Sequence, residues 1–181
     1  MLTKWGMVGK KNSVVGQKAT RIPIVNKMSD DLTAAQICYN SLFRHGVDQK
    51  RRVQIPAKWL PGEESVEFTL ILWPKSAEGP CLRVLPPKEM AQLMESIDAM
   101  PNTDPNKTVL KRFIGSESVQ VATDKTGRIC LPEAMTQAAR IKDEAVLVGL
   151  LDRFEIWNPE RYQKVKAADA VMAQEAFKLM E

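Results

Sequence analysis

One short motif occurs twice in this sequence. Residues 48–56 and residues 124–132 share the pattern Asp, any three residues, Arg, apolar, any, apolar, Pro, at an offset of 76 residues. The likeness continues downstream, because residues 81–88 and residues 153–160 each alternate like a strand and end in a Pro that can open a helix. Two copies of one module fit these patterns better than one irregular domain, and this repeat constrains the fold more than any other feature of the chain.

The repeat divides the chain into four expected parts. We expect the first module at residues 37–100, a linker helix at residues 101–115, and the second module, with a C-terminal helix, at residues 116–181. Residues 1–36 show no hydrophobic period and contain six Lys and Arg residues against two Asp, so we expect a flexible basic arm there. The alternative is that translation begins at Met28 and most of this arm is not made.

Two strands are expected around the turn of each motif. In the second copy, apolar and polar residues alternate over residues 119–124 and again over residues 128–131, which is the period of strands with one buried face. We expect these strands to pair with each other as a hairpin, with Asp124 opposite Arg128. Gly127 suits the last loop position, where a left-handed backbone is usual.

Arg51 takes the place of that glycine in the first copy. The first turn is therefore expected to have a different shape or to carry strain.

The rest of each module is expected to contain a short helix after Pro56 or Pro132, a strand pair and a longer helix. A Pro is tolerated at a helix start because its missing N–H is not needed there. The apolar stripes of the longer helices are interpreted as core or subunit interface. The expected ranges are 57–60, 66–73, 82–85 and 88–100 in the first copy, 133–140, 146–151, 154–157 and 160–180 in the second, and 105–115 between them, with Val109, Leu110, Phe113 and Ile114 facing the core.

The composition is that of an ordinary folded protein, with 44% hydrophobic and 27% charged residues. The longest apolar runs, residues 68–73 and 145–151, are far shorter than the ~20 residues needed to cross a bilayer. Since no secretory signal opens the chain, we expect a cytoplasmic protein without a membrane segment. The net charge of +4 lies in the arm, so affinity for nucleic acid must come from local clusters. The densest contains Arg44, Lys50, Arg51, Arg52 and Lys58.

Catalysis has few candidate groups here. The one histidine, His45, lies in an expected strand, and no metalloprotease, hydrolase or nucleotide-binding motif is present. Cys38, Cys81 and Cys130 are widely spaced and lack the partners of a zinc site or a disulfide framework. We expect no enzyme activity, no metal and no cofactor.

DNA recognition has more support. A twisted β-ribbon can enter the major groove, where an outward-facing arginine can donate to O6 and N7 of guanine, and Arg52 and Arg128 occupy such places. We expect Asp48 and Asp124 to hold these guanidinium groups. The expected phosphate contacts are Lys50, Arg51 and Lys125. Each Asp–Arg pair, taken alone, is better interpreted as an ion pair that steadies a turn, worth about 0–1 kcal/mol, but two copies in matching positions favour recognition.

The motif pair resembles the MraZ family. The resemblance rests on Asp48 with residues 52–58 (Arg-Val-Gln-Ile-Pro-Ala-Lys), on Asp124 with Arg128, and on residues 146–157, where Val-Leu-Val-Gly is followed by Arg-Phe-Glu-Ile-Trp. It covers about residues 38–165. The family usually has Gly before the first signature Arg, and Arg51 departs from that pattern.

The resemblance implies an α+β, β-rich fold. Two tandem AbrB- and MazE-like swapped-hairpin modules would form a pseudo-two-fold, β-barrel-like core with peripheral helices. It also implies a DNA-binding transcriptional regulator in the cytoplasm, associated with the nucleoid, that represses the division and cell-wall gene cluster. Such a regulator would bind direct repeats in its own promoter as a ring-shaped homo-oligomer.

Two alternatives remain open. An antitoxin-like DNA-binding protein of the same fold would use its C-terminal helix to wrap a toxin. A ring-forming scaffold that does not bind DNA would use the Asp–Arg turns only for structure. Binding to promoter DNA separates the scaffold from the other two, and a co-purifying partner separates the antitoxin.

Overall fold

The computed structural model describes residues 37–62, 65–76 and 78–179, and the expected basic arm at residues 1–36 lies outside them. These residues belong to one compact unit, Gln36–Glu181. In chain order its elements are β1 (Leu42–Gly46), β2 (Arg52–Gln54), the 3-10 helix η1 (Ala57–Trp59), β3 (Glu67–Ser76), β4 (Gly79–Leu85), α1 (Pro87–Asp98), α2 (Pro105–Ser116), β5 (Ser118–Ala122), β6 (Arg128–Cys130), α3 (Glu133–Ala139), β7 (Glu144–Gly149), β8 (Phe154–Trp157) and α4 (Pro159–Phe177).

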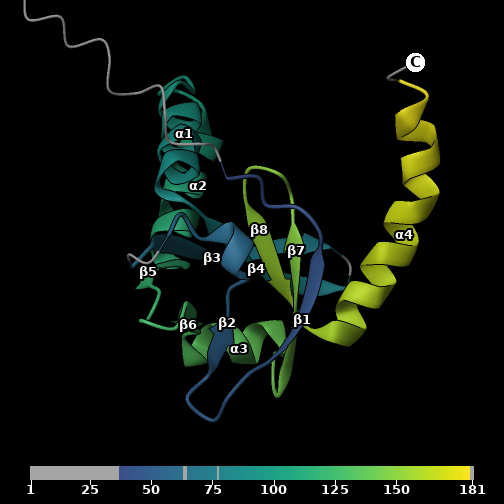
Figure 1. Cartoon of the computed structure of the whole chain (residues 1–181). Helices are drawn as coiled ribbons and strands as arrows, with labels where there is room; N and C mark the ends of the chain where they lie inside the picture. The colour runs from purple at the N-terminus through teal and green to yellow at the C-terminus, as the bar shows by residue number, and fades with distance from the viewer. Residues whose placement is uncertain (1–36, 63–64, 77, 180–181) are drawn as a thin grey trace, which may run out of the picture. The chain divides into compact units, whose positions relative to one another are not determined.

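Six strands form one antiparallel sheet in the order β1-β7-β8-β4-β3-β5, and β2 pairs with β6 in a separate two-stranded ribbon. The predicted α+β class is confirmed. One face of the sheet packs against the ribbon, η1 and α3 around the main core, which includes Trp59, Leu82 and Phe154. The other face is covered by α1 and α2 at one end and by α4 at the opposite end (Figure 1).

The two halves of the chain are related by a pseudo-two-fold arrangement. Each strand of the first half has a counterpart at the mirrored place in the sheet: β1 with β5, β3 with β7, and β4 with β8. The pairing of β4 with β8 is centred on Arg83 opposite Glu155, and the pairing of β2 with β6 is centred on Val53 opposite Ile129. The halves therefore share one sheet and one ribbon, and their strands are interleaved.

The predicted hairpin of the second motif is wrong beyond its turn. The Asp124 N–H donates to the Arg128 carbonyl over 2.8 Å, as expected, but β5 then pairs with β3 and β6 pairs with β2 of the other half. The first motif keeps one bridge beyond its turn, Val47 opposite Val53, and β1 then pairs with β7. The alternation of side chains fixes which face of a strand is buried, but it does not select the neighbouring strand.

The predicted strand pairs β3–β4 and β7–β8 are confirmed. The short helices begin directly after Pro56 and Pro132. The longer helices end earlier than predicted, α1 at Asp98 and α4 at Phe177. No helix in the described ranges is both long and apolar enough to span a bilayer.

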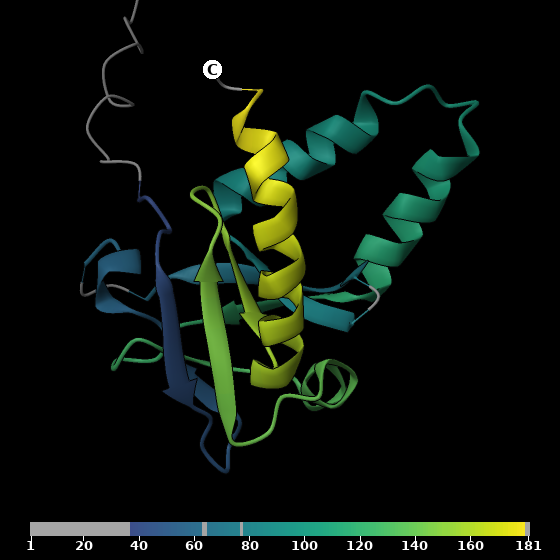
Figure 2. The same cartoon turned by 90° about the vertical axis from the view of Figure 1, so that its right-hand side faces the viewer.

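The apolar stripe predicted for α2 is only partly buried. Ile114 lies in the core, whereas Val109 is 57% exposed and Leu110 37% exposed, so their predicted core positions are wrong. The reason is that α1 and α2 form a helical hairpin whose connecting loop extends away from the sheet (Figure 2). Only the part of α2 nearest β5 reaches the core.

Candidate nucleic-acid interface

The two motif turns have the same backbone geometry. In each turn the Asp N–H donates to the Arg carbonyl, and the N–H of the residue before the Arg donates back to the Asp carbonyl. The distances are 3.1 Å for Asp48 to Arg52, 2.8 Å for Arg51 to Asp48, 2.8 Å for Asp124 to Arg128 and 2.9 Å for Gly127 to Asp124. The two copies of the sequence motif therefore fold into two copies of the same turn.

Each aspartate divides its two carboxylate oxygens between the backbone and the arginine. Oδ1 of Asp48 accepts from the N–H groups of Lys50 and Arg52, both at 2.9 Å, while Oδ2 accepts from Arg52 Nε at 2.8 Å and lies 2.7 Å from Nη2. In the second copy, Oδ2 of Asp124 accepts from Arg128 Nε at 2.9 Å and lies 2.8 Å from Nη2. One carboxylate thus fixes both the turn and the guanidinium.

The Asp124 turn has one further donor. Oδ1 of Asp124 accepts from the Thr126 hydroxyl at 2.7 Å, besides the N–H groups of Thr126 and Arg128. The hydrogen bond from the Thr126 side chain, followed by those from Arg128, holds the pKa of Asp124 far below its ordinary range. The Arg52 side chain lowers the pKa of Asp48, and Asp48 raises the pKa of Arg52. Both aspartates are therefore ionised at neutral pH.

The side-on contact leaves the end of each guanidinium open. Arginine has five N–H groups, and the carboxylate takes one from Nε and one from Nη2. Of the three that remain, one on Nη1 and one on Nη2 point in parallel away from the aspartate, which is the geometry that matches O6 and N7 of guanine. The side chains of Arg52 and Arg128 are each 32% exposed, so both reach solvent.

Arg51 adopts the conformation that its position in the turn demands. Its φ is 58°, close to the 75° of Gly127, so the first turn has the same shape as the second and carries a strained residue. The Arg51 side chain crosses to the other half, where Nε donates to the Leu131 carbonyl at 3.3 Å and Nη1 lies 3.7 Å from a Glu133 carboxylate oxygen. The expected difference between the turns is therefore strain and not shape.

The ribbon sets the spacing of the two turns. Arg51 O accepts from Leu131 N, and Ile55 N donates to Gly127 O, so Gly127 lies opposite Ile55. Ile55 lies four positions after Arg51, and a strand rises about 3.3 Å per residue, which puts the turns roughly 13 Å apart. That separation is close to the ~12 Å width of the major groove.

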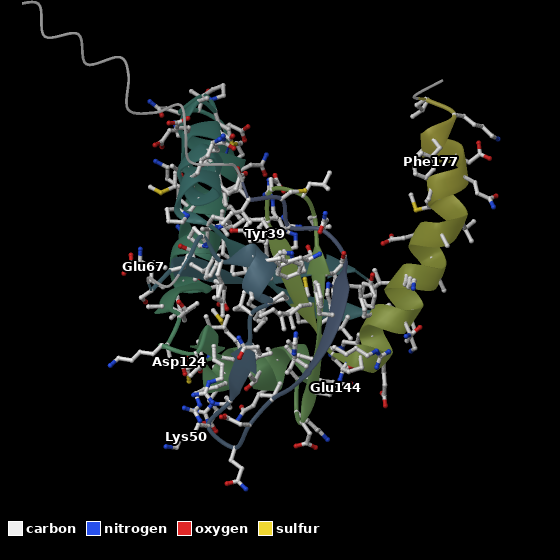
Figure 3. The ribbon with its side chains drawn as sticks, in the orientation of Figure 1. Tyr39, Lys50, Glu67, Asp124, Glu144 and Phe177 are labelled. Atoms are coloured by element: carbon white, nitrogen blue, oxygen red, sulfur yellow. The ribbon has the colours of Figure 1, made fainter. Side chains whose placement is uncertain are left out.

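The remaining basic residues do not form one patch. Lys50 and Lys125 are exposed, and Lys50 lies at the same end of the molecule as Asp124 (Figure 3). By contrast, Arg44 lies 3.4 Å from Glu144, and Lys58 donates to Asn40 and Ser41. Arg44 and Lys58, two members of the predicted cluster, are therefore engaged away from the first turn, which contains Lys50, Arg51 and Arg52.

Three residues of this region were missed by sequence reasoning. Thr126 binds Asp124, and Gln54 and Cys130 each donate from the ribbon to the turn of the other half. Gln54 and Cys130 stand at the position where the motif allows any residue, so the pattern itself gave no signal. Only the swapped pairing of β2 with β6 shows what this position contacts.

Other kinds of site have little support in the described part of the chain. It contains no group of three or more His, Cys, Asp or Glu residues that could hold a metal ion. Cys38 and Cys130 are exposed free thiols. His45 lies in β1 with its ring stacked at 6.2 Å from that of Phe43, which is a packing position.

Comparisons with known proteins point to one family. A family model described as "MraZ protein, putative antitoxin-like" matches residues 114–178. The chain is 31% identical over 139 residues to a protein of Clostridium tetani, covering 77% of this chain and 94% of the relative, and 32% identical over 139 residues to one of Clostridium acetobutylicum with the same coverage. A protein of Pediococcus pentosaceus is 32% identical over 122 residues, covering 67% of this chain and 82% of the relative. All three relatives are named "Transcriptional regulator MraZ".

Proposed function

The chain belongs to the MraZ family, and on this basis we propose that it is a sequence-specific DNA-binding transcriptional regulator. One observation carries the proposal: in both turns a carboxylate holds the arginine side-on and leaves its parallel end N–H groups accessible. If the ion pair served only to stabilise a turn, the same free guanidinium N–H groups would not need to occur in both turns. Preorganisation of this kind reduces the entropy lost when the arginine meets a base.

In the proposed complex the β2–β6 ribbon lies over the major groove. Arg52 and Arg128 each donate to a guanine, and Asp48 and Asp124 hold them in place without touching the base. Lys50, Lys125 and Arg51 supply phosphate contacts, which position the ribbon but carry no sequence information. The estimated spacing of the turns, roughly 13 Å, corresponds to about four base-pair steps of ~3.4 Å, so it supports readout of two separated base pairs by one chain.

The finer parts of the proposal follow the family resemblance. The modules at residues 37–100 and 116–181, joined by the helix within residues 101–115, would be AbrB- and MazE-like swapped hairpins around a barrel-like core. The protein would assemble into a homo-oligomeric ring in the cytoplasm, associated with the nucleoid. It would bind direct repeats in its own promoter and repress the division and cell-wall genes. Because the ring links several binding modules, their effective concentration would raise the overall affinity above that of a single weak contact.

Gel shifts with a duplex from the promoter upstream of its own gene, across a salt series, test the proposal. Arg52→Ala and Arg128→Ala should each weaken specific binding by roughly 1–3 kcal/mol, whereas Lys50→Ala and Lys125→Ala should weaken binding to all sequences and reduce the salt slope. Unchanged affinity in both arginine variants would favour a scaffold that does not bind DNA.

The second candidate is an antitoxin-like regulator. The family description includes the words "antitoxin-like", and α4 presents the exposed side chains of Val171, Met172 and Phe177. An apolar helix end of this kind suits a protein partner. Purification of the chain from its own cells with a stoichiometric toxin bound to α4 would favour this candidate.

A further inference from the structure

The two turns are held by different residues of the opposite half. Gln54 and Cys130 occupy equivalent places in the ribbon, because Gln54 lies opposite Arg128 and Cys130 lies opposite Arg52. Gln54 Nε2 donates to the carbonyls of Thr126 at 3.0 Å and Gly127 at 3.1 Å, both in the second turn. Cys130 Sγ makes a single contact of 3.3 Å with the Lys50 carbonyl in the first turn. An amide has two strong donors, whereas a thiol has one weak donor.

A chain of hydrogen bonds connects Gln54 to Arg128 through the second turn. The peptide groups whose carbonyls bind Gln54 belong to Thr126 and Gly127, and the N–H and hydroxyl of Thr126 bind Asp124 Oδ1. The same carboxylate holds Arg128 through Oδ2. Gln54 itself has no hydrogen bond to Arg128 among the described residues, so any effect on the guanidinium passes through the turn.

We propose that Gln54, a residue of the first half, is a positioning residue for Arg128, the DNA-reading arginine of the second half. The inference rests on the proposed DNA-binding function. Without the Gln54 amide, the Thr126–Gly127 segment gains freedom, Asp124 no longer holds a single orientation, and Arg128 loses its preset rotamer. Arg52 lies in the other turn and does not depend on this amide.

A double-mutant cycle on the full chain tests the proposal, with fluorescence anisotropy against the promoter duplex used in the gel shifts. Gln54→Met keeps the length of the side chain and removes its donors. It should weaken binding about 3- to 10-fold in the wild-type background and equally in the Arg52→Ala background. In the Arg128→Ala background it should change affinity less than about twofold, because the residue that it positions is already absent.

A loss of equal size in both arginine backgrounds would overturn the inference, since it would show a general effect on the fold or the ribbon. If Arg128→Ala itself left binding unchanged, the proposed function of that turn would fail and the inference with it. If Arg128→Ala weakened binding while Gln54→Met did not, only the inference would fail. These three results are distinguishable within one set of variants.

Two further measurements separate positioning from folding. Gln92→Met, the same chemical change on the exposed face of α1, should leave affinity unchanged. Binding of Gln54→Met to duplexes with single base substitutions should show relaxed preference at the base pairs that Arg128→Ala also relaxes, and at no others. Relaxation at the Arg52 positions instead would contradict the assignment.

Discussion

Arg51 and Gly127 take the same left-handed place in the two turns, but only the glycine is enclosed. A Cβ added at Gly127 would lie 2.9 Å from Leu60 Cδ1 and 3.1 Å from Gln54 Nε2, at a φ of 75°. At Arg51 the side chain already exists and extends across β6. The first turn therefore tolerates a side chain in a conformation that costs an L-residue about 1–2 kcal/mol.

Substitutions at these two places should show the strain directly. Arg51→Gly should be more stable than Arg51→Ala by about 1 kcal/mol, because both remove the same contacts and only the glycine relaxes the backbone. Gly127→Ala should lower the free energy of unfolding by about 1–2 kcal/mol. Denaturant titration of the three variants checks this, and equal stabilities of Arg51→Gly and Arg51→Ala would show that residue 51 is unstrained.

The two aspartates also make stability depend on pH. Their pKa values are lowered in the folded protein from the ordinary 3.8, most strongly for Asp124. A depressed folded pKa contributes stability that is complete above the unfolded value and is lost as pH falls through the folded value. The free energy of unfolding should therefore fall as pH drops below about 4, and Asp124→Asn should show a shallower fall than the parent over the same range. Parallel pH profiles for the two proteins would contradict this assignment.

The chemistry of the site could largely be predicted from the sequence, because Asp and Arg recur at a spacing that closes a turn. The residues that support the two turns could not be predicted from it. Thr126 has Lys50 at its equivalent position, so the repeat gives no reason to connect its hydroxyl with Asp124. Gln54 and Cys130 differ chemically, and their role depends on which strand lies beside them.

At the level of elements, period-two alternation located the strands but not the exchange of partners between the halves. It also predicted a buried face for β5 on which Val119 is in fact 40% exposed. A hairpin costs less loop entropy than a long-range pair, so local pairing was the natural expectation. The exchange instead lets β2 and β6 bury Val53 and Ile129 against one shared core. Whether a strand pairs locally or with the other half therefore depends on the contacts that both halves make in three dimensions.

The centre of the shared sheet contains a buried ion pair. Arg83 Nη2 lies 3.0 Å from Glu155 Oε1, with side-chain exposures of 12% and 5%. Trp157 Nε1 donates to the other carboxylate oxygen at 3.0 Å, and the Arg83 guanidinium lies 3.8 Å from the centroid of the Trp73 ring. The two charges lie at the pseudo-two-fold axis and belong to different halves.

Removing one partner of this pair should be far more damaging than removing both. Arg83→Met removes the Arg83 cation from beside the buried Glu155 carboxylate and should cost about 3–5 kcal/mol, whereas the double variant Arg83→Met with Glu155→Leu should recover most of that loss. Thermal and denaturant unfolding of the single and double variants measures the difference. Additive losses would mean that the two charges act independently.

At the scale of the whole molecule, the pseudo-symmetry breaks at the helices. The counterparts α1 and α4 each follow the equivalent strand, β4 or β8. The apolar side of α1 packs with α2, and Ile97 and Ile114 are buried between them. No described element covers the C-terminal half of α4, where Val171 is 73% exposed and Met172 71% exposed. Because a monomer gains nothing by exposing these side chains, α4 is the natural contact surface for the proposed ring.

Charged substitutions on α4 should therefore dissociate the ring without unfolding the protomer. The double variant Val171→Asp with Met172→Asp should lower the mass of the assembly in light scattering, while its melting temperature stays near that of the parent because both side chains are already solvated. Its affinity for a duplex with several repeats should fall tenfold or more, whereas affinity for a single repeat should not change, since only the multivalent gain is lost. Gln174→Asp, an exposed residue on the same helix, adds a charge without removing apolar surface and serves as the control. An unchanged mass in the double variant would exclude this end of α4 from the subunit contact.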